Sequence, residues 1–242
     1  MLGRFLQWRL RTAHPPVKLS TRAARYGAVA CLLGIAILLW PLGRGYLDGQ
    51  AAIPDLAARA DALIATGRGP DDLGPGRWDT LVRGQDLAPG AIGATDRRTG
   101  DGGLSAVTQS LAAQEDPAAG EPGWARLRHM GVALGYGAGL SEDQIGALWL
   151  DRVEMVRVTR GGDVVRTVGF WTAADRAYAK APAALAEAEF SDLILWLIVP
   201  PQASNDQAAQ IERAARIARY LDGACLPRDA DDVRLDGCAA GR

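Results

Sequence analysis

The segment Leu140–Arg152 reads L-S-E-D-Q-I-G-A-L-W-L-D-R and predicts a buried helix with a defined start. Ser141 and Gln144 have the spacing of a capping box, in which each side chain satisfies a backbone N–H of the other residue. The apolar residues of one helix face follow directly: Ile145, Leu148 and Trp149. Helical patterns of this kind dominate the chain, so the sequence predicts a mainly α protein with a small β element.

Other helices are predicted on both sides of this segment from their apolar periodicity. They cover Ala51–Thr66, Leu104–Gln114, Trp124–Tyr136, the Ala-rich Thr172–Glu189 and Gln207–Leu221. Gly131 and Gly135 weaken the third of these, because glycine lowers helix propensity. Stretches 67–76 and 114–123 are rich in loop-forming residues and read as a loop and an exposed linker.

A β-hairpin is predicted next to the capped helix. The stretches Val153–Thr159 and Val164–Phe170 flank the turn sequence R-G-G-D. The apolar run Leu193–Val199 ends at Pro200 and is too short to span a membrane. It is consistent with either a buried strand or a buried helix segment, and periodicity does not separate the two.

The composition fits one globular domain plus an anchor. The chain has 242 residues, is 48% hydrophobic and 23% charged, and carries a net charge of −1. A chain of this length can bury a core without the help of a metal or a disulfide. Its histidines and cysteines do not have zinc-ligand spacing.

An uncharged segment, Tyr26–Gly43, predicts one membrane-spanning helix, with Tyr26 and Trp40 as interfacial aromatics. A cleaved signal peptide and a buried soluble helix are the alternatives. The residues before it form a basic arm without acids, which the positive-inside rule assigns to the cytoplasm rather than to nucleic-acid binding. The basic residues of this arm are Arg4, Arg9, Arg11, Lys18, Arg22 and Arg25. The remaining domain would then lie outside the cytoplasm.

The cysteines agree with this topology. Cys31 lies in the apolar segment, whereas Cys225 and Cys238 would close a short loop near the C-terminus. An oxidising compartment would allow these two to form a disulfide, the alternative being two unpaired surface thiols. The expected organisation is a cytoplasmic arm over 1–25, a spanning helix over 26–43, a domain over 50–222 and a tail over 223–242.

Several segments together resemble the peptidoglycan glycosyltransferases of glycosyltransferase family 51. Gly103–Leu111, G-L-S-A-V-T-Q-S-L, is similar to a family motif like G-G-S-T-I-T-Q-Q-L. Leu140–Arg152 is similar to a later pattern like L-S-K-x-x-I-L-x-x-Y-L-N-R, and Gly169–Lys180 and Leu185–Pro201 resemble the segments that follow it. The resemblance implies a lysozyme-like helical domain that polymerises lipid II at the bacterial inner membrane. A divalent metal is possible by this resemblance alone.

The same resemblance nominates site residues. The family motif like G-G-S-T-I-T-Q-Q-L is called the Ser-Thr motif. It is matched by Ser105, Thr108 and Gln109, which are candidates for substrate binding, or for hydrogen bonds that support the fold. Arg126 and Arg128 are candidates for a diphosphate or lipid headgroup, or for a plain solvated face. The bond-forming reaction requires a carboxylate base for the acceptor hydroxyl.

The acidic residues of the family's chemistry are replaced in this chain. Thr95 takes the position of the base glutamate, which leaves Asp96 as the nearest carboxylate, with a helix cap or turn residue as its other interpretation. His129 takes the position of a second glutamate, and it is otherwise a partly buried core residue. Most of the segment that precedes the Ser-Thr motif in the family is also missing here.

Three functions follow as hypotheses. The first is a periplasmic protein with impaired catalysis that binds lipid II or a glycan strand, or regulates other cell-wall synthesis proteins. The second is an active divergent polymerase that uses Asp96 as its base. The third is an unrelated bitopic scaffold of the envelope.

Overall fold

The computed structural model describes residues 21–85, 102–115, 123–158, 164–198, 207–228, 232 and 234–239. The chain divides into two compact units, Met1–Trp40 and Pro41–Arg242. In the first unit the described residues are helical and belong to α1 (Thr21–Ala65). Within the described part of the chain, no helix combines the length and the apolar character needed to cross a membrane.

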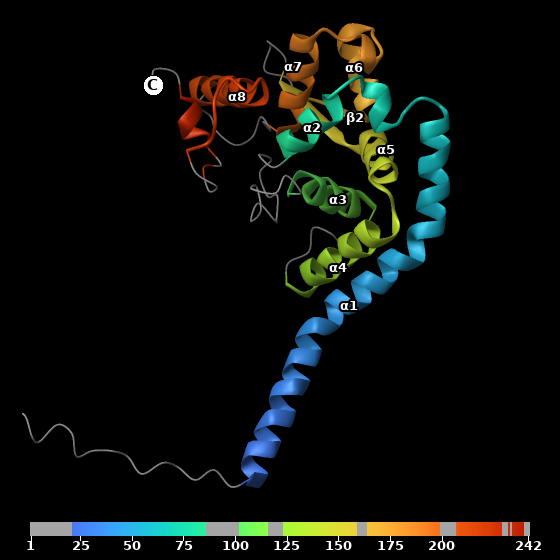
Figure 1. Ribbon diagram of the computed structural model, residues 1–242, viewed down its shortest axis with the longest axis vertical. Coiled ribbons are helices and arrows are strands. Elements are labelled where there is room, and N and C mark those ends of the chain that lie inside the picture. The colour runs from blue at the N-terminus through green and yellow to red at the C-terminus, as the bar shows by residue number, and fades with distance from the viewer. Residues whose placement is uncertain are drawn as a thin grey trace, which may run out of the picture. The chain divides into compact units, whose positions relative to one another are not determined.

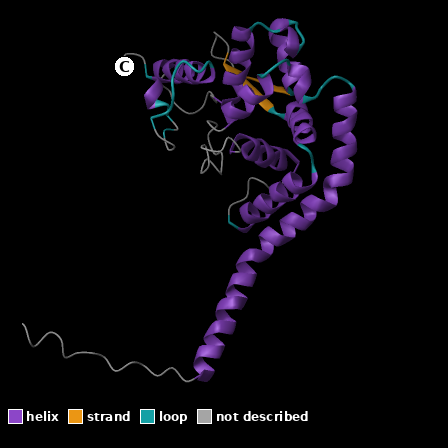
Figure 2. Ribbon diagram, viewed as in Figure 1, coloured by secondary structure: helices purple, strands orange, loops and turns teal. Residues whose placement is uncertain are grey.

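The second unit is mainly helical, as expected (Figures 1 and 2). Its elements, after the end of α1, are η1 (Pro70–Leu73), α2 (Arg77–Gln85), α3 (Gly102–Glu115), α4 (Trp124–Gly139), α5 (Glu142–Arg152), β1 (Glu154–Val158), β2 (Val164–Val168), α6 (Phe170–Tyr178), η3 (Pro182–Ala184), α7 (Glu187–Ile198), α8 (Gln207–Leu221) and η4 (Asp236–Cys238).

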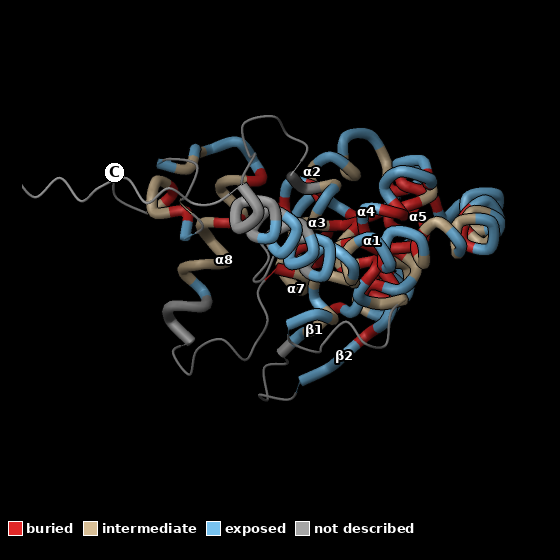
Figure 3. Tube along the Cα trace, turned by 90° about the horizontal axis from the view of Figure 1, so that it is seen from below, coloured by how far each residue is buried: buried red, intermediate tan, exposed pale blue. Residues whose placement is uncertain are grey.

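Helix α5 lies at the centre of the core and begins as its sequence predicts. The Ser141 hydroxyl accepts from the Gln144 N–H at 3.2 Å, and the Gln144 side chain accepts from the Ser141 N–H at 3.0 Å. Trp149 is fully buried, and its indole N–H donates to the Ser110 hydroxyl of α3 at 3.1 Å. Buried residues gather where α3, α4 and α5 pack together (Figure 3).

The middle of α1 packs on α4 through glycines. A Cβ atom at Gly49 would lie 2.7 Å from the Val132 carbonyl oxygen, and one at Gly135 would lie 2.8 Å from the Tyr46 carbonyl oxygen. Small residues four apart on both helices let the two backbones approach this closely. Gly135 therefore serves packing, although by propensity alone it weakens the helix.

The predicted hairpin forms. β1 pairs antiparallel with β2, with Glu154 opposite Val168 and Val158 opposite Val164. The expected turn lies outside the described residues. β1 packs against α7, which ties the hairpin to the helical core.

The prediction of a single helix over Thr172–Glu189 is wrong. α6 ends at Tyr178, Ala179 adopts a left-handed conformation with φ of 51°, and α7 begins only at Glu187. Pro182, which starts η3, cannot donate the hydrogen bond that a continuing helix would need. The apolar run that begins at Leu193 is helical, so its alternative interpretation as a buried strand is wrong. The stretch 67–76, which was expected to be a loop, contains the short helix η1.

The residues after α8 fold back onto it. Cys225 and Cys238 form a disulfide, as the sequence suggested, with Cα atoms 5.3 Å apart. Arg219 of α8 donates to the Cys238 carbonyl at 2.7 Å, and Leu235 is buried. The described part of the expected tail is therefore packed against the domain.

Candidate functional site

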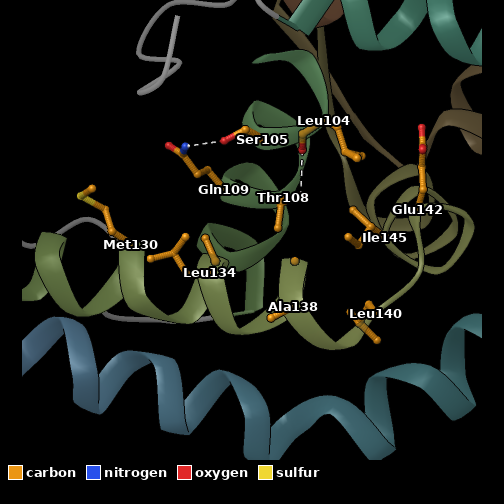
Figure 4. Close-up of a pocket in the computed structure, with 12 residues that line it drawn as sticks. Leu104, Ser105, Thr108, Gln109, Met130, Leu134, Ala138, Leu140, Glu142 and Ile145 are labelled. Atoms are coloured by element: carbon orange, nitrogen blue, oxygen red, sulfur yellow. Dashed lines mark hydrogen bonds between the residues drawn. The ribbon is translucent and has the colours of Figure 1, made fainter. Parts of the chain in front are cut away.

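A cavity of about 580 Å³ opens between α3, α4 and the start of α5 (Figure 4). Its volume lies within the range of about 300–1,000 Å³ that is typical of small-molecule sites. All the lining residues belong to the second unit, so one packed core positions them.

The polar wall comes from α3. Ser105, Thr108 and Gln109, the residues that the sequence nominated for substrate binding, all line the cavity. Their spacing of three and four residues brings them to one helix face. The Thr108 hydroxyl donates to the Leu104 carbonyl at 2.8 Å, and the Gln109 amide donates to the Ser105 hydroxyl at 3.3 Å. These bonds within α3 orient the side chains, and Ser105 lies at the exposed surface.

The apolar wall comes mainly from α4. Met130, Ala133, Leu134 and Ala138 line the cavity from this side, and Leu134 is 57% exposed. Gly137 adds open space, because the nearest atom to a Cβ placed there is a Thr108 methyl at 3.9 Å. An exposed leucine beside open space offers apolar surface to a ligand.

Glu142 supplies the only ionisable side chain among the described residues that line the cavity. It is the first residue of α5 and lies at the exposed rim. The Trp78 indole N–H donates to its Oε1 at 3.0 Å, and Trp78 packs edge-to-face on Trp149 with centroids 6.4 Å apart. A partly buried aromatic that packs against the core therefore holds one oxygen of the rim carboxylate in position.

His129 is buried behind the polar wall and does not line the cavity. Its Nε2 lies 3.2 Å from the Gln109 carbonyl oxygen, which can only accept, so Nε2 carries the proton and donates. Within the described part of the chain, its buried Nδ1 has no hydrogen-bond partner. The geometry matches a core residue between α3 and α4, which was the second interpretation of this position.

The two candidate phosphate-binding arginines differ in their surroundings: Arg128 forms an ion pair, whereas Arg126 is exposed. Arg128 donates from Nε and Nη2 to one Asp48 oxygen of α1 at 3.1 and 3.0 Å. Arg44 approaches the same carboxylate at 3.2 Å. Arg126 is exposed, and neither Arg126 nor Arg128 lines the cavity. The structure therefore places neither arginine in the lining that contains the residues of the Ser-Thr motif.

Asp96 and Thr95 lie outside the described residues. Among the residues that are described, there is no group of three or more metal-ligating side chains. Neither member of the Cys225–Cys238 disulfide lines the cavity.

Sequence reasoning missed Glu142, Met130 and Leu134 as lining residues. Glu142 lies in the first turn of α5, where an acid interacts favourably with the helix dipole, so its place in the sequence has an ordinary structural explanation. Met130 and Leu134 are four residues apart, but an apolar pair at that spacing does not by itself distinguish a cavity wall from a core face.

No family model, no curated protein and no solved structure matches this chain.

Proposed function

We propose that this chain is an envelope protein of the inner membrane, related to the family 51 glycosyltransferases, that binds lipid II or a glycan strand with little or no polymerase activity. In this proposal the basic arm is cytoplasmic, residues 26–43 anchor the chain, and the domain over 50–222 is periplasmic.

The observation that carries the proposal is the lining of the cavity. Ser105, Thr108 and Gln109 belong to the segment that resembles the family's Ser-Thr motif, and all three line one mainly apolar cavity. A concave apolar site with a few convergent polar groups is the usual form of a small-molecule site. The site suits a lipid-linked saccharide, which has apolar and hydroxyl-rich parts.

The periplasmic assignment has two supports. Tyr26–Gly43 is uncharged and follows a basic arm, in keeping with the positive-inside rule. The Cys225–Cys238 disulfide is of a kind that persists in oxidising compartments such as the periplasm. Protease added to spheroplasts, at a concentration that cleaves the purified chain, should digest the domain, and its protection under those conditions would overturn this topology.

Reduced activity follows from the chemistry at three positions. Thr95 replaces a base glutamate, and its neutral hydroxyl is too weakly basic to deprotonate a sugar hydroxyl. His129, at the position of the second glutamate, is buried and donates to a backbone carbonyl. Arg128 is engaged by Asp48. The nearest carboxylate, Asp96, is one methylene shorter than the glutamate base. Because misplacing a catalytic group by about 1 Å can cost about 10²-fold in rate, we expect polymerisation at least about 10²-fold slower than in an ordinary member.

Two assays on the full-length chain in nanodiscs test the proposal. Labelled lipid II should bind, and a continuous lipid II polymerisation assay should show only the reduced rate. Ordinary rates that disappear in Asp96→Asn would favour the active divergent polymerase. If lipid II is neither bound nor polymerised, the third hypothesis, an unrelated scaffold of the envelope, is favoured.

A further inference from the structure

The cavity has no positive charge in its lining, as far as the described residues form it. No lysine, arginine or histidine lines it. Arg128, on the same helix as the apolar wall, is held by Asp48 of α1 at 3.0 Å. A phosphate entering the cavity would lose water without gaining charge-assisted hydrogen bonds. The cavity therefore does not suit the anionic part of a ligand.

Glu142 adds a negative charge at one end of this cavity. Its Oε1 accepts from the Trp78 indole at 3.0 Å, and no hydrogen bond within the described residues occupies Oε2. A carboxylate is an acceptor with several lone-pair sites, so Oε2 can take a hydrogen bond from a hydroxyl donor. The same charge repels a phosphate placed nearby.

The other polar groups lie at the opposite end. Figure 4 shows Ser105 and Gln109 at one end and Glu142 at the other, beyond Leu104 and Ile145. The surface between the two polar ends is largely apolar. A ligand that fills the cavity thus meets hydroxyl-compatible groups at its ends and an apolar wall between them.

We propose that the cavity binds an uncharged, hydroxyl-bearing amphiphile, and that Glu142 is the residue that selects it over an anionic one. The inference rests on the proposed function, because it identifies which part of a lipid-linked saccharide the cavity takes. The sugar hydroxyls donate to Glu142, apolar groups lie against Leu134, and any diphosphate remains outside.

The test compares two short probes with the same tail, hexyl β-glucoside and hexyl phosphate. Isothermal titration uses the full-length chain in nanodiscs, with the heat of empty nanodiscs subtracted. The glucoside should bind and the phosphate should not. Glu142→Gln should weaken glucoside binding about tenfold, as expected for one hydrogen bond to a charged group, and should therefore narrow the preference for the glucoside over the phosphate. Equal binding of both probes to the unmodified chain would overturn the inference.

Two further variants locate the effect. Asp143→Asn removes a neighbouring charge that does not line the cavity and should leave both affinities unchanged. Gly137→Leu introduces a side chain where only a methyl contact at 3.9 Å exists, so it should fill the space and abolish glucoside binding. Equal effects of the Glu142 and Asp143 changes, or full binding by the filled variant, would contradict the inference.

The lipid II assay separates this inference from the proposed function. If lipid II binds and the glucoside affinity is unchanged by Glu142→Gln, the inference is overturned and the proposed function stands. Glucoside binding that depends on Glu142, without any lipid II binding, would overturn the proposed function and keep the cavity's selectivity.

Discussion

Gly131 of α4 lies directly against the Leu42 carbonyl of α1, so closely that a Cβ atom at this position would overlap the oxygen. A Cβ there would also lie 2.8 Å from the Tyr46 backbone nitrogen. Because the neighbouring atoms are backbone, they cannot rotate away as a side chain could. The crossing of the two helices therefore requires glycine at this position.

Gly131→Ala should destabilise the domain by about 1–3 kcal/mol, the usual cost of overpacking a tight interface. Gly137→Ala on the same helix is the matched control, because its Cβ would meet only the Thr108 methyl at 3.9 Å. That change should be neutral or stabilise by about 0.5–1 kcal/mol through helix propensity. Denaturant unfolding followed by circular dichroism measures both, and equal effects of the two changes would show that the contact does not constrain the helices.

The difference between these glycines explains which features the sequence predicts. Local signals were sufficient where neighbours in the chain determine the structure: the Ser141 capping box and the β1–β2 hairpin both form. The role of Gly131 depends on Leu42, which is distant in the sequence. Helix propensity depends on local sequence and does not include that contact, so it predicts only a weakened helix.

The same reasoning applies to the break in the Ala-rich segment and to the site. Alanine favours helix at every step, but Pro182 and the left-handed Ala179 end α6. In the site, Ser105 and Gln109 could be identified because they share one motif. Glu142 belongs to another helix, and only tertiary packing brings it to the same cavity.

Tyr178 should resist ionisation at alkaline pH. Burial, followed by the hydrogen bond from its hydroxyl to Asp192 at 2.6 Å, raises the pKa of Tyr178 well above its usual value. Because the neutral phenol is favoured in the folded state, the associated stability is present below the unfolded-state pKa of about 10. It is lost as the pH rises through the raised value.

Tyrosinate absorbance during an alkaline titration measures this effect. Tyr178→Phe should remove one high-pH component from the titration curve and should cost about 1 kcal/mol of stability at neutral pH. A titration curve that keeps all its high-pH components after the substitution would assign the resistance to another tyrosine.

Asp232 should make the C-terminal segment sensitive to acid. Burial alone would raise the pKa of Asp232, but hydrogen bonds from the backbone N–H groups of Arg228, Gly237 and Asp236 lower it. The stability contributed by the ionised form is therefore present above the unfolded-state pKa of about 3.9. It is lost as the pH falls through the lowered folded-state value.

Asp232→Ala should destabilise the segment by about 0.5–1.5 kcal/mol at neutral pH, because one exposed and two partly buried backbone donors lose their acceptor. The difference from the unmodified chain should shrink as the pH falls through the acid range. Hydrogen exchange of the Asp236 and Gly237 amides follows the segment directly, and Asp222→Ala, at an exposed position after α8, is the control. A difference that stays constant down to the lowest pH would contradict the role of the charge.

The disulfide should hold the residues after α8 in place. It joins Cys225 to Cys238 across a separation of 13 residues, and a loop of about that length is expected to contribute about 3 kcal/mol. Without it, Leu235 would depend on the Arg219 contact to the Cys238 carbonyl and on the Arg216–Asp236 ion pair at 2.8 Å. The two contacts are partly exposed, so they hold the segment less firmly than the covalent bond.

Replacing both cysteines with serine should therefore increase tryptic cleavage after Arg228 and Arg234, while the rest of the domain stays resistant. Cys31→Ser is the matched control and should leave the cleavage rate unchanged, because this residue precedes the domain. Thiol labelling of the denatured chain without reductant adds an independent measurement, in which only Cys31 should react. Three labelled cysteines would show that the pair is reduced in the native protein. Equal cleavage of the paired and unpaired chains would show that α8 holds the segment without the disulfide.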